Sequence, residues 1–519
     1  MTSSVFPLFF WFFLSSSLAV FQHSGVKLRI TDAAQDVLKE VVMAFLKELL
    51  NKPWDDISIL DKKYAKYDIS GLTFSCLSVS KDEIDLTFRD NSGVHFEVSD
   101  LAFTAAFKRK AKVGRINPDR GRSSIAGRGL STTIEVNLNR DPQGHLKVEM
   151  GNCEFKADDI LIVSHGKMGD VVDLFKTLIK KNIQEQICPS IKNFIPQVNS
   201  MSDQLTMRMN LPSELTSKLN VPGGQEIIID YSVSGDVRVS ANSLDIPFRG
   251  FVSTPGSNVD PDSIRKGEES VFTQTDQMAY VGISEFFLNS ATTSLHRAGA
   301  MSKTDQVTQP ILWGFLKFLQ VFTHPFDLMN PMSSEVVVVE VPEISITRDK
   351  GVILKVPKVS GKVSAGQDVL SMEASCTVAL KVAVEENYLI LPSDDVDCTI
   401  ATSSMIKDIM VKPLNWFLSS KVKTFLRGLF DKGLHIPLPE GMGFTQGNIV
   451  YQNGYLVVGG SLRLAPSGGE KVVELVMSNI NTGGAAGGGA QQPAGGAQQP
   501  AGGAQHLAGG AQQPAGHHH

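Results

Sequence analysis

The sequence has little cysteine, no excess of basic charge and no recognisable catalytic motif. Five cysteines scattered over 519 residues cannot form the dense disulfide framework of a small secreted domain. A net charge of −5 and a pI near 6.1 disfavour an ordinary nucleic-acid-binding protein. GxSxG, HExxH, GxxxxGK(S/T) and paired CxxC patterns are missing, and the His, Asp and Glu residues lack metal-ligand spacing. We therefore expect no enzyme, no metal and no cofactor.

Other absences in the sequence exclude further classes of protein. Beyond the first residues no stretch has 18 consecutive apolar residues, so no membrane-spanning helix is expected. No N-x-S/T sequon occurs, so N-glycosylation is not expected. The chain is 42% hydrophobic, which is too much for a wholly disordered protein. Its length predicts two to four globular domains, at roughly 100–200 residues per domain.

The two ends of the chain differ from the rest in composition. An apolar run over 5–14, followed by small residues at Ser17 and Ala19, predicts a cleaved secretory signal over 1–19, with an uncleaved anchor as the alternative. Residues 483–519 repeat the unit GGAQQPA and have no apolar period, which predicts a disordered polar tail, with an adhesive role as the alternative. His517–His519 are either native or an expression scar.

Between these ends the pattern of helix and alternating strands occurs twice. Apolar residues recur at threes and fours after Thr31-Asp32, over about 167–186, over 284–297 and over about 403–431, which predicts four helices. Alternating strands are expected over 84–107, 134–150, 336–341, 352–359 and 370–384. We expect an α+β fold, with an N-terminal barrel over 20–241, a Pro/Gly linker over 242–269 and a C-terminal barrel over 270–482. Long helices beside long strands that are apolar on one face suggest highly curved antiparallel sheets, each wrapped on a helix.

The apolar helix stripes are wide enough to leave surface that could face a lipid, although for any one residue ordinary core packing is the favoured interpretation. The candidates for lipid contact are Val41, Val42, Phe45, Leu46, Val171, Phe175, Leu178, Phe286, Phe287 and Phe417.

The cysteines suggest two bridges. Cys153 and Cys188 flank the second predicted helix, and a bridge between them would attach that helix to a strand. A hairpin turning near Asn387 would place Cys376 opposite Cys398, where directly opposed positions can meet disulfide geometry. Cys76 is left over, as a buried free thiol or, alternatively, an intermolecular bridge.

One segment, 108–128, concentrates positive charge on an otherwise acidic chain. Its basic residues are Lys108, Arg109, Lys110, Lys112, Arg115, Arg120, Arg122 and Arg128. With one acid, Asp119, it carries +7, and the remainder carries −12. Its glycines favour a loop at the tip of a hairpin whose strands end at Phe107 and begin again near Thr132. Arg and Lys there suit phosphate-bearing head groups. The alternatives are a solvated charge run and a proteolytic processing site.

Four stretches resemble one known family. They are SGVKLRITDAAQDV, QEIIIDYSVSGDVRVSANSLDIPFRGFV, QMAYVGISEFFLNSATTSLHRAGAM and HIPLPEGMGFTQGNIVYQNGYLVVGGSLRL. Together they resemble the bactericidal/permeability-increasing and lipopolysaccharide-binding protein family, which includes the cholesteryl ester and phospholipid transfer proteins. The resemblance covers about residues 24–465 in family order, and Cys153 and Cys188 bracket a helix as the family's N-domain disulfide does.

The resemblance implies an elongated boomerang of two similar barrels joined by a central sheet, with a pocket for one phospholipid in each barrel. It also implies a cationic tip where 108–128 lies, although this segment is longer and richer in Gly and Arg than the family pattern. The repeat tail and the Cys376–Cys398 bridge depart from that pattern too. The chain lacks a C-terminal amphipathic helix, which counts against neutral-lipid transfer.

We therefore expect a secreted, monomeric protein of innate defence that binds phospholipids and lipopolysaccharide at the bacterial outer membrane surface. The alternative is an extracellular phospholipid carrier or surface-active protein without a bacterial target.

Overall fold

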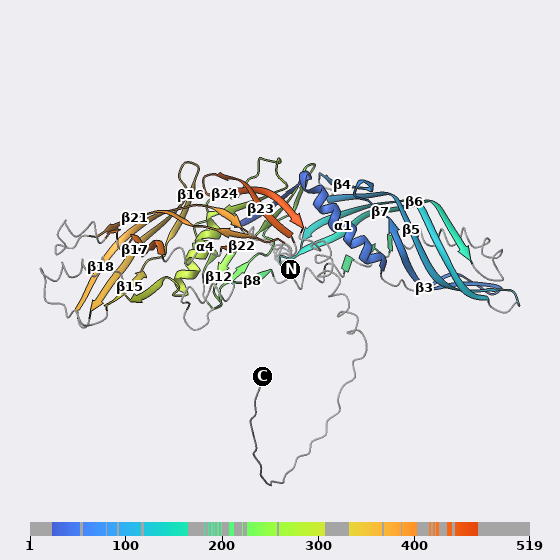
Figure 1. Ribbon diagram of the computed structural model, residues 1–519, viewed down its shortest axis with the longest axis horizontal. Helices are drawn as coiled ribbons and strands as arrows, with labels where there is room; N and C mark the ends of the chain where they lie inside the picture. Colours follow the sequence, from blue (N-terminus) through green and yellow to red (C-terminus); the bar gives the residue numbers. More distant parts are fainter. Residues whose placement is uncertain are drawn as a thin grey trace, which may run out of the picture.

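The protein is described by a computed structural model of an elongated, strand-rich molecule (Figure 1). The described residues are 23–51, 56–78, 80–90, 93–115, 119–164, 207–211, 226–256, 259–306, 332–365, 368–385, 387–401, 433–438 and 442–464, with isolated positions within 181–199, at 221 and within 415–424. None of the helices in these ranges is long and apolar enough to cross a membrane.

One end of the molecule is a curled antiparallel sheet in the order β2-β3-β5-β6-β7, with β4 paired to β5 (Figure 1). Its strands are β2 (Ile57–Lys62), β3 (Ala65–Ser78), β4 (Ile84–Arg89), β5 (Gly93–Val113), β6 (Asp119–Arg140) and β7 (Leu146–Ser164). Inward side chains of β5 alternate with outward ones over most of its length, as a sheet covered on one face requires. The helix α1 (Gln35–Asn51) contacts β3 and β4.

A central six-stranded sheet, in the order β10-β11-β1-β13-β24-β23, joins the two ends. Its strands are β1 (Val26–Thr31), β10 (Arg238–Ser240), β11 (Ser243–Phe248), β13 (Ala279–Ser284), β23 (Met442–Tyr451) and β24 (Tyr455–Leu464). The N-terminal strand β1 lies between β11 and β13, and β13 in turn pairs with β24. Backbone hydrogen bonds therefore connect segments that are hundreds of residues apart.

The other end contains a second curled sheet, in the order β14-β15-β17-β18-β21, with β16 paired to β17 (Figure 1). Its strands are β14 (Ser302–Gln306), β15 (Met332–Val338), β16 (Glu343–Thr347), β17 (Gly351–Ala365), β18 (Asp368–Leu380) and β21 (Ser393–Ile400). The helix α4 (Glu285–Arg297) lies against β12 and β16.

Two three-stranded sheets and three 3-10 turns complete the described structure. The sheets are β12-β9-β8, from β8 (Arg208–Asn210), β9 (Ile228–Asp230) and β12 (Phe251–Ser253), and β19-β20-β22, from β19 (Ala383–Glu385), β20 (Tyr388–Ile390) and β22 (Leu434–His435). The turns are η1 (Asp32–Ala34), η2 (Lys81–Glu83) and η4 (Pro261–Ser263). One large core cluster draws its buried residues from both halves of the chain.

Most expected strands and two of the four expected helices are found. The strand expected over 370–384 instead ends at Leu380, and β19 then joins a different sheet. The expected helices over 167–186 and 403–431 lie almost wholly outside the described residues, apart from isolated helical positions.

The segment 242–269, expected as a linker, contributes β11 to the central sheet and also contains β12. Pro247 fits within β11 because β10 pairs only as far as Asp245, so no ladder hydrogen bond to β10 is lost there. The division into two domains stays a prediction.

Candidate functional site

The basic segment forms the two arms of the β5–β6 hairpin rather than a loop. β5 continues six residues beyond Phe107, and β6 begins at Asp119, well before Thr132. The alternation of inward and outward side chains, which the apolar residues show as far as Phe107, continues along β5 beyond that residue. Over this part β5 stays paired with β6. Since successive side chains point to opposite faces, every second residue of each strand lies on the outer face, and most of the basic residues fall at these outward positions. We call the exposed set the basic face: Lys108, Lys110, Lys112, Arg120 and Arg122.

Within the basic face, like charges lie directly opposite one another. Lys108 is the Cα partner of Arg122, and Lys110 is the partner of Arg120. On the other side of β5, Lys66 of β3 is the partner of Lys112. Directly opposed like charges destabilise a sheet. An anion bound between the opposed side chains, on the outer face of the sheet, would relieve this repulsion.

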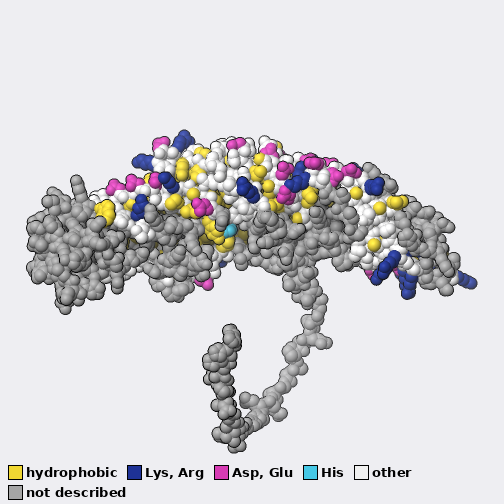
Figure 2. Space-filling model, viewed as in Figure 1, with side chains coloured by type: hydrophobic (Ala, Val, Ile, Leu, Met, Phe, Trp, Pro, Cys, Tyr) yellow, Lys and Arg dark blue, Asp and Glu magenta, His cyan; other side chains and the backbone are white. Residues whose placement is uncertain are grey.

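Nearby acids compensate the basic face only in part. Asp68 is the Cα partner of Lys110, but its carboxylate also lies 3.7 Å from the ammonium of Lys66, which is 3.5 Å from Asp61. Among the described residues, no member of the basic face forms an ion pair. Lys and Arg side chains gather at this end of the surface in Figure 2.

Arg109 lies on the inner face and is only 2% exposed, so the expectation that it binds a head group is wrong. Its Nη1 donates to the Arg122 carbonyl (3.1 Å) and to the Ser123 hydroxyl (2.8 Å). Gly121 leaves room for the guanidinium, since a Cβ there would lie 2.9 Å from Nη2. Arg109 therefore supports the hairpin from inside, through the two hydrogen bonds that its Nη1 donates to β6.

The two remaining basic candidates lie apart from the basic face. Arg115 is exposed in the turn after β5. Arg128 is exposed on β6, six residues from Arg122 and so about 20 Å away at ~3.4 Å per residue. The cluster thus contains five of the eight predicted residues, with Arg115 beyond its end.

The lipid-pocket candidates divide into packed and undescribed residues. Phe287 belongs to the large core and packs on Tyr231, while Phe286 stacks on Phe251 at 5.7 Å. Val41 and Val42 are half-buried on α1. The side chains of Phe45 and Leu46, and all of Val171, Phe175, Leu178 and Phe417, lie outside the described residues. The packing of Phe286 and Phe287 matches the ordinary core interpretation, and a lipid role for the candidates stays a prediction.

Both expected disulfides are present. Cys153 of β7 bonds Cys188, 35 residues away. Cys376 of β18 and Cys398 of β21 are direct Cα partners and are bonded, which confirms the register argument. Asn387 in the connection has φ of 70°, a conformation that asparagine tolerates. The side chain of Cys76 lies outside the described residues, so its state stays open.

Sequence reasoning missed a polar cleft of about 230 Å³ on the outer face of the central sheet. Arg29 pairs with Asp245 through two 2.7 Å hydrogen bonds, and Lys27 donates to Glu269 at 2.8 Å. The alternation in VKLRIT, with two cations between apolar residues, was the available signal. Because these charges are already paired, the cleft offers no strong preference for an anion or a cation.

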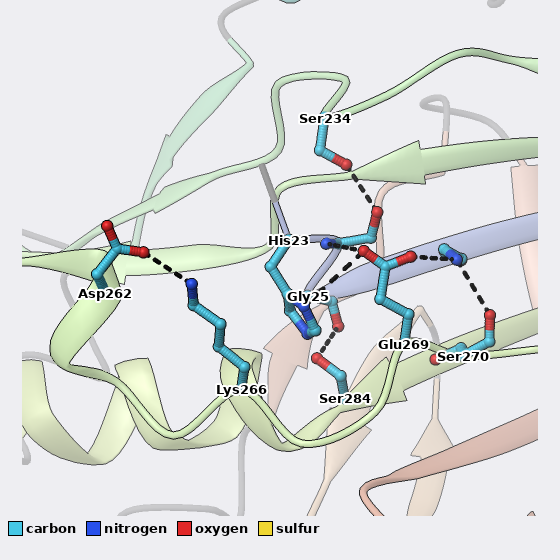
Figure 3. Close-up of polar contacts among 10 residues, drawn as sticks. His23, Gly25, Ser234, Asp262, Lys266, Glu269, Ser270 and Ser284 are labelled. Carbon is cyan, nitrogen blue, oxygen red and sulfur yellow. Dashed lines mark hydrogen bonds and ion pairs between the residues drawn. The ribbon is translucent and has the colours of Figure 1, made fainter. Parts of the chain in front are cut away.

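A polar cluster beside this cleft attaches the start of the described chain to the segment before β13 (Figure 3). Glu269 accepts from the Ser24 amide, and its carboxylate lies 3.8 Å from the His23 ring. Burial lowers the pKa of His23, and Glu269 opposes this only in part. Burial would raise the pKa of Glu269, but hydrogen bonds from Lys27 and Ser24 hold it below its usual value. The described residues contain no group of three His, Cys, Asp or Glu that could hold a metal ion.

Comparison with known proteins places this fold in a family. The model of the LBP / BPI / CETP family, N-terminal domain, matches residues 20–201, and that of its C-terminal domain matches residues 224–317. The chain belongs to the LBP/BPI/CETP family. The crystal structure of a lipopolysaccharide-binding protein superimposes with a TM-score of 0.51 at 19% identity, covering 85% of this chain and 99% of that one. This structural likeness shows the fold alone.

Relatives within the LBP/BPI/CETP family carry different functional names. The chain is 25% identical to the human phospholipid transfer protein, over 87% of this chain and 92% of that relative. It is 22% identical to the bovine lipopolysaccharide-binding protein, over 57% of this chain and 60% of the relative. It is 24% identical to a bactericidal permeability-increasing protein of Sebastes schlegelii, over 54% and 58%. These family members are thus named for lipid binding, lipid transfer or action on bacteria.

Proposed function

We propose that the protein is a secreted lipid-binding protein of innate defence whose basic face binds the phosphates of lipopolysaccharide. The observation that carries this proposal is the double row of opposed cations, Lys108 with Arg122 and Lys110 with Arg120. Such an arrangement favours a ligand with several closely spaced anionic groups, as the phosphorylated lipid A part of lipopolysaccharide has. Action against Gram-negative bacteria would follow from binding at the outer membrane surface.

We also propose that the curled sheets form two barrels of a boomerang, each wrapped on a long helix and each holding one phospholipid. Burying an acyl chain contributes roughly 0.8 kcal/mol per methylene, so an apolar interior would hold such a ligand well. The two disulfides support an oxidising, extracellular location, which agrees with the signal segment expected over 1–19. We expect a monomer with no catalytic activity, and detectable ester hydrolysis would contradict this.

A second candidate function is extracellular phospholipid transfer without a bacterial target. The similarity to the phospholipid transfer protein favours it, because that match extends over 87% of this chain. In this case the basic face would only orient the protein on a phospholipid surface, and lipid exchange between neutral vesicles would not need it.

The test compares wild type with a basic-face variant in which Lys108, Lys110, Lys112, Arg120 and Arg122 are changed to Ser. A matched control changes five exposed cations elsewhere to Ser: Arg348, Lys350, Lys355, Lys362 and Arg463. Both variants lose three Lys and two Arg, so they lose the same charge, while the control also loses the hydrogen bonds from Arg348 to Gln452 and the Lys362–Glu335 ion pair. Binding to lipid A aggregates and to phosphatidylcholine vesicles is measured across a salt series.

Wild type and the control variant should bind lipid A tightly, and salt should weaken their binding strongly because exposed charges are screened by salt. The basic-face variant should bind weakly at every salt concentration. Equal binding of all three proteins to both surfaces would exclude the proposal. Transfer of labelled phospholipid at an unchanged rate by the basic-face variant would favour the second candidate.

A further inference from the structure

The turn between β2 and β3 places an exposed tyrosine at the same end of the molecule as the basic face. Tyr64 is 69% exposed, the highest value among the large hydrophobic side chains in the described ranges. Its carbonyl accepts a hydrogen bond of 2.6 Å from the Gly114 amide in the turn after β5. This hydrogen bond connects the two turns and holds the backbone of Tyr64 beside the end of β5.

The exposure of Tyr64 is specific to that position. In the same motif, DKKYAKYD, Tyr67 follows three residues later on β3 and is fully buried. The core thus uses one tyrosine of the motif and leaves the other in solvent. The ammonium of Lys63 lies 5.5 Å from the centre of the Tyr64 ring, a cation–π contact that leaves most of the ring exposed. An apolar ring that serves no internal packing is available to a partner.

The surroundings of Tyr64 indicate the chemistry of that partner. Lys62, Lys63 and Arg115 are all exposed around the two turns, and the basic face follows along β5 and β6. Tyrosine has an apolar body and a polar hydroxyl, and such rings settle at the boundary between water and the apolar part of a lipid layer. Long basic side chains can extend along that boundary with their charges in the head-group layer.

We propose that Tyr64 is an interfacial anchor that enters the head-group region of an anionic lipid surface when the basic face binds its phosphates. The proposal rests on the proposed function, because it needs a charged lipid surface at this end of the molecule. It adds an apolar contact that is insensitive to salt. The β2–β3 turn and the β5–β6 hairpin then form one docking surface.

The first test uses the variant Tyr64→Trp with vesicles of mixed phosphatidylglycerol and phosphatidylcholine. Wild type supplies the background emission of the native tryptophans. Val271→Trp is the matched control, since Val271 is 60% exposed but lines the cleft on the central sheet. The indole of the Tyr64→Trp variant should shift its emission to the blue on binding and be quenched by brominated acyl chains. The control indole should show neither change.

The second test compares Tyr64→Ser with wild type and Val271→Ser in equilibrium binding to the same vesicles. Tyr64→Ser should bind roughly tenfold more weakly at both low and high salt, as expected for the loss of part of the ~150–250 Å² of surface that an aromatic ring can bury. Its salt dependence should match wild type, because no charge has changed. The basic-face variant should instead lose the salt dependence itself.

The two proposals fail in different ways. If the introduced indole is neither shifted nor quenched and Tyr64→Ser binds like wild type, the anchor is excluded while salt-dependent binding can still hold. If wild type binds lipid A aggregates without salt dependence, the proposed function fails. A wild type that binds lipid A but not these vesicles excludes the anchor alone, and one that binds neither excludes both.

Discussion

The Nη1 of Arg109 donates a 2.8 Å hydrogen bond to the hydroxyl of Ser123 across the β5–β6 hairpin, from inside the curled sheet. The neighbours of Arg109 on β5, Lys108 and Lys110, point outward and are exposed. One basic run therefore has two roles: its outward members make the basic face, and the inward Arg109 ties together the strands that carry it. The alternation of a single strand separates these roles.

Arg109→Met should destabilise the protein and distort the basic face. The change removes two donated hydrogen bonds and leaves the Ser123 hydroxyl buried without this donor, which costs about 1–3 kcal/mol of unfolding free energy. Urea denaturation measures the loss, and lipid A binding should weaken although no exposed cation has been removed. Arg122→Ser is the control, because Arg122 is exposed and its removal should not lower stability. Equal stability of Arg109→Met and wild type would show that the internal tie is unimportant.

Lys108→Glu should stabilise the hairpin while weakening lipid binding. Glu at this position would face Arg122 across the strand pair and replace a repulsion with an attraction, worth roughly 0.2–1 kcal/mol. The expected result is a small rise in unfolding free energy together with reduced affinity for lipid A. The double variant Lys108→Glu/Arg122→Glu restores like charges and should lose the gain in stability. A stabilised single variant with undiminished lipid binding would argue against the basic face as the site.

The local sequence pattern predicted strands well where buried and exposed residues alternate regularly. Phe103, Ala105 and Phe107 are all buried on β5, as their spacing indicated. The predicted strand stopped at Phe107 because Arg109 breaks the apolar alternation. Arg109 is buried with hydrogen bonds to the Ser123 hydroxyl and the Arg122 carbonyl, and these partners on β6 cannot be found from the local pattern on β5.

The central sheet could not be predicted from periodicity. β1 pairs with β13, about 250 residues later in the chain, and local patterns carry no information on such pairing. The Pro-containing segment around β11 resembled a linker for the same reason, since its partners lie far away in sequence. By contrast, the Cys376–Cys398 pair was predictable because both residues belong to one local antiparallel register.

The free energy of unfolding should fall as the pH drops from 7.5 to 5.5, and part of that fall should come from His23. Burial lowers the pKa of His23 in the folded state, so between that value and the ordinary value near 6.5 the unfolded chain binds a proton that the folded chain does not. Stability is therefore lost as pH falls through 6.5, and this contribution levels off below the folded-state pKa. Burial lowers the pKa of His435 as well, which acts in the same direction. Urea denaturation of His23→Gln should give a shallower pH dependence than wild type, and an identical slope would exclude His23 as a contributor.

Removing the Cys376–Cys398 bridge should cost about 3 kcal/mol of unfolding free energy in the chain-entropy model, given its separation of 22 residues. The double variant Cys376→Ala/Cys398→Ala, which leaves no unpaired thiol, should show a lower Tm without reduced lipid A binding. The reason is that this bridge joins β18 to β21, whereas the basic face lies on β5 and β6 in a different sheet. Thermal unfolding and vesicle binding are measured on the same sample. A loss of lipid A binding by a variant that is still folded would place part of the lipid A site in the sheet that contains β18 and β21, and would contradict its placement on the basic face.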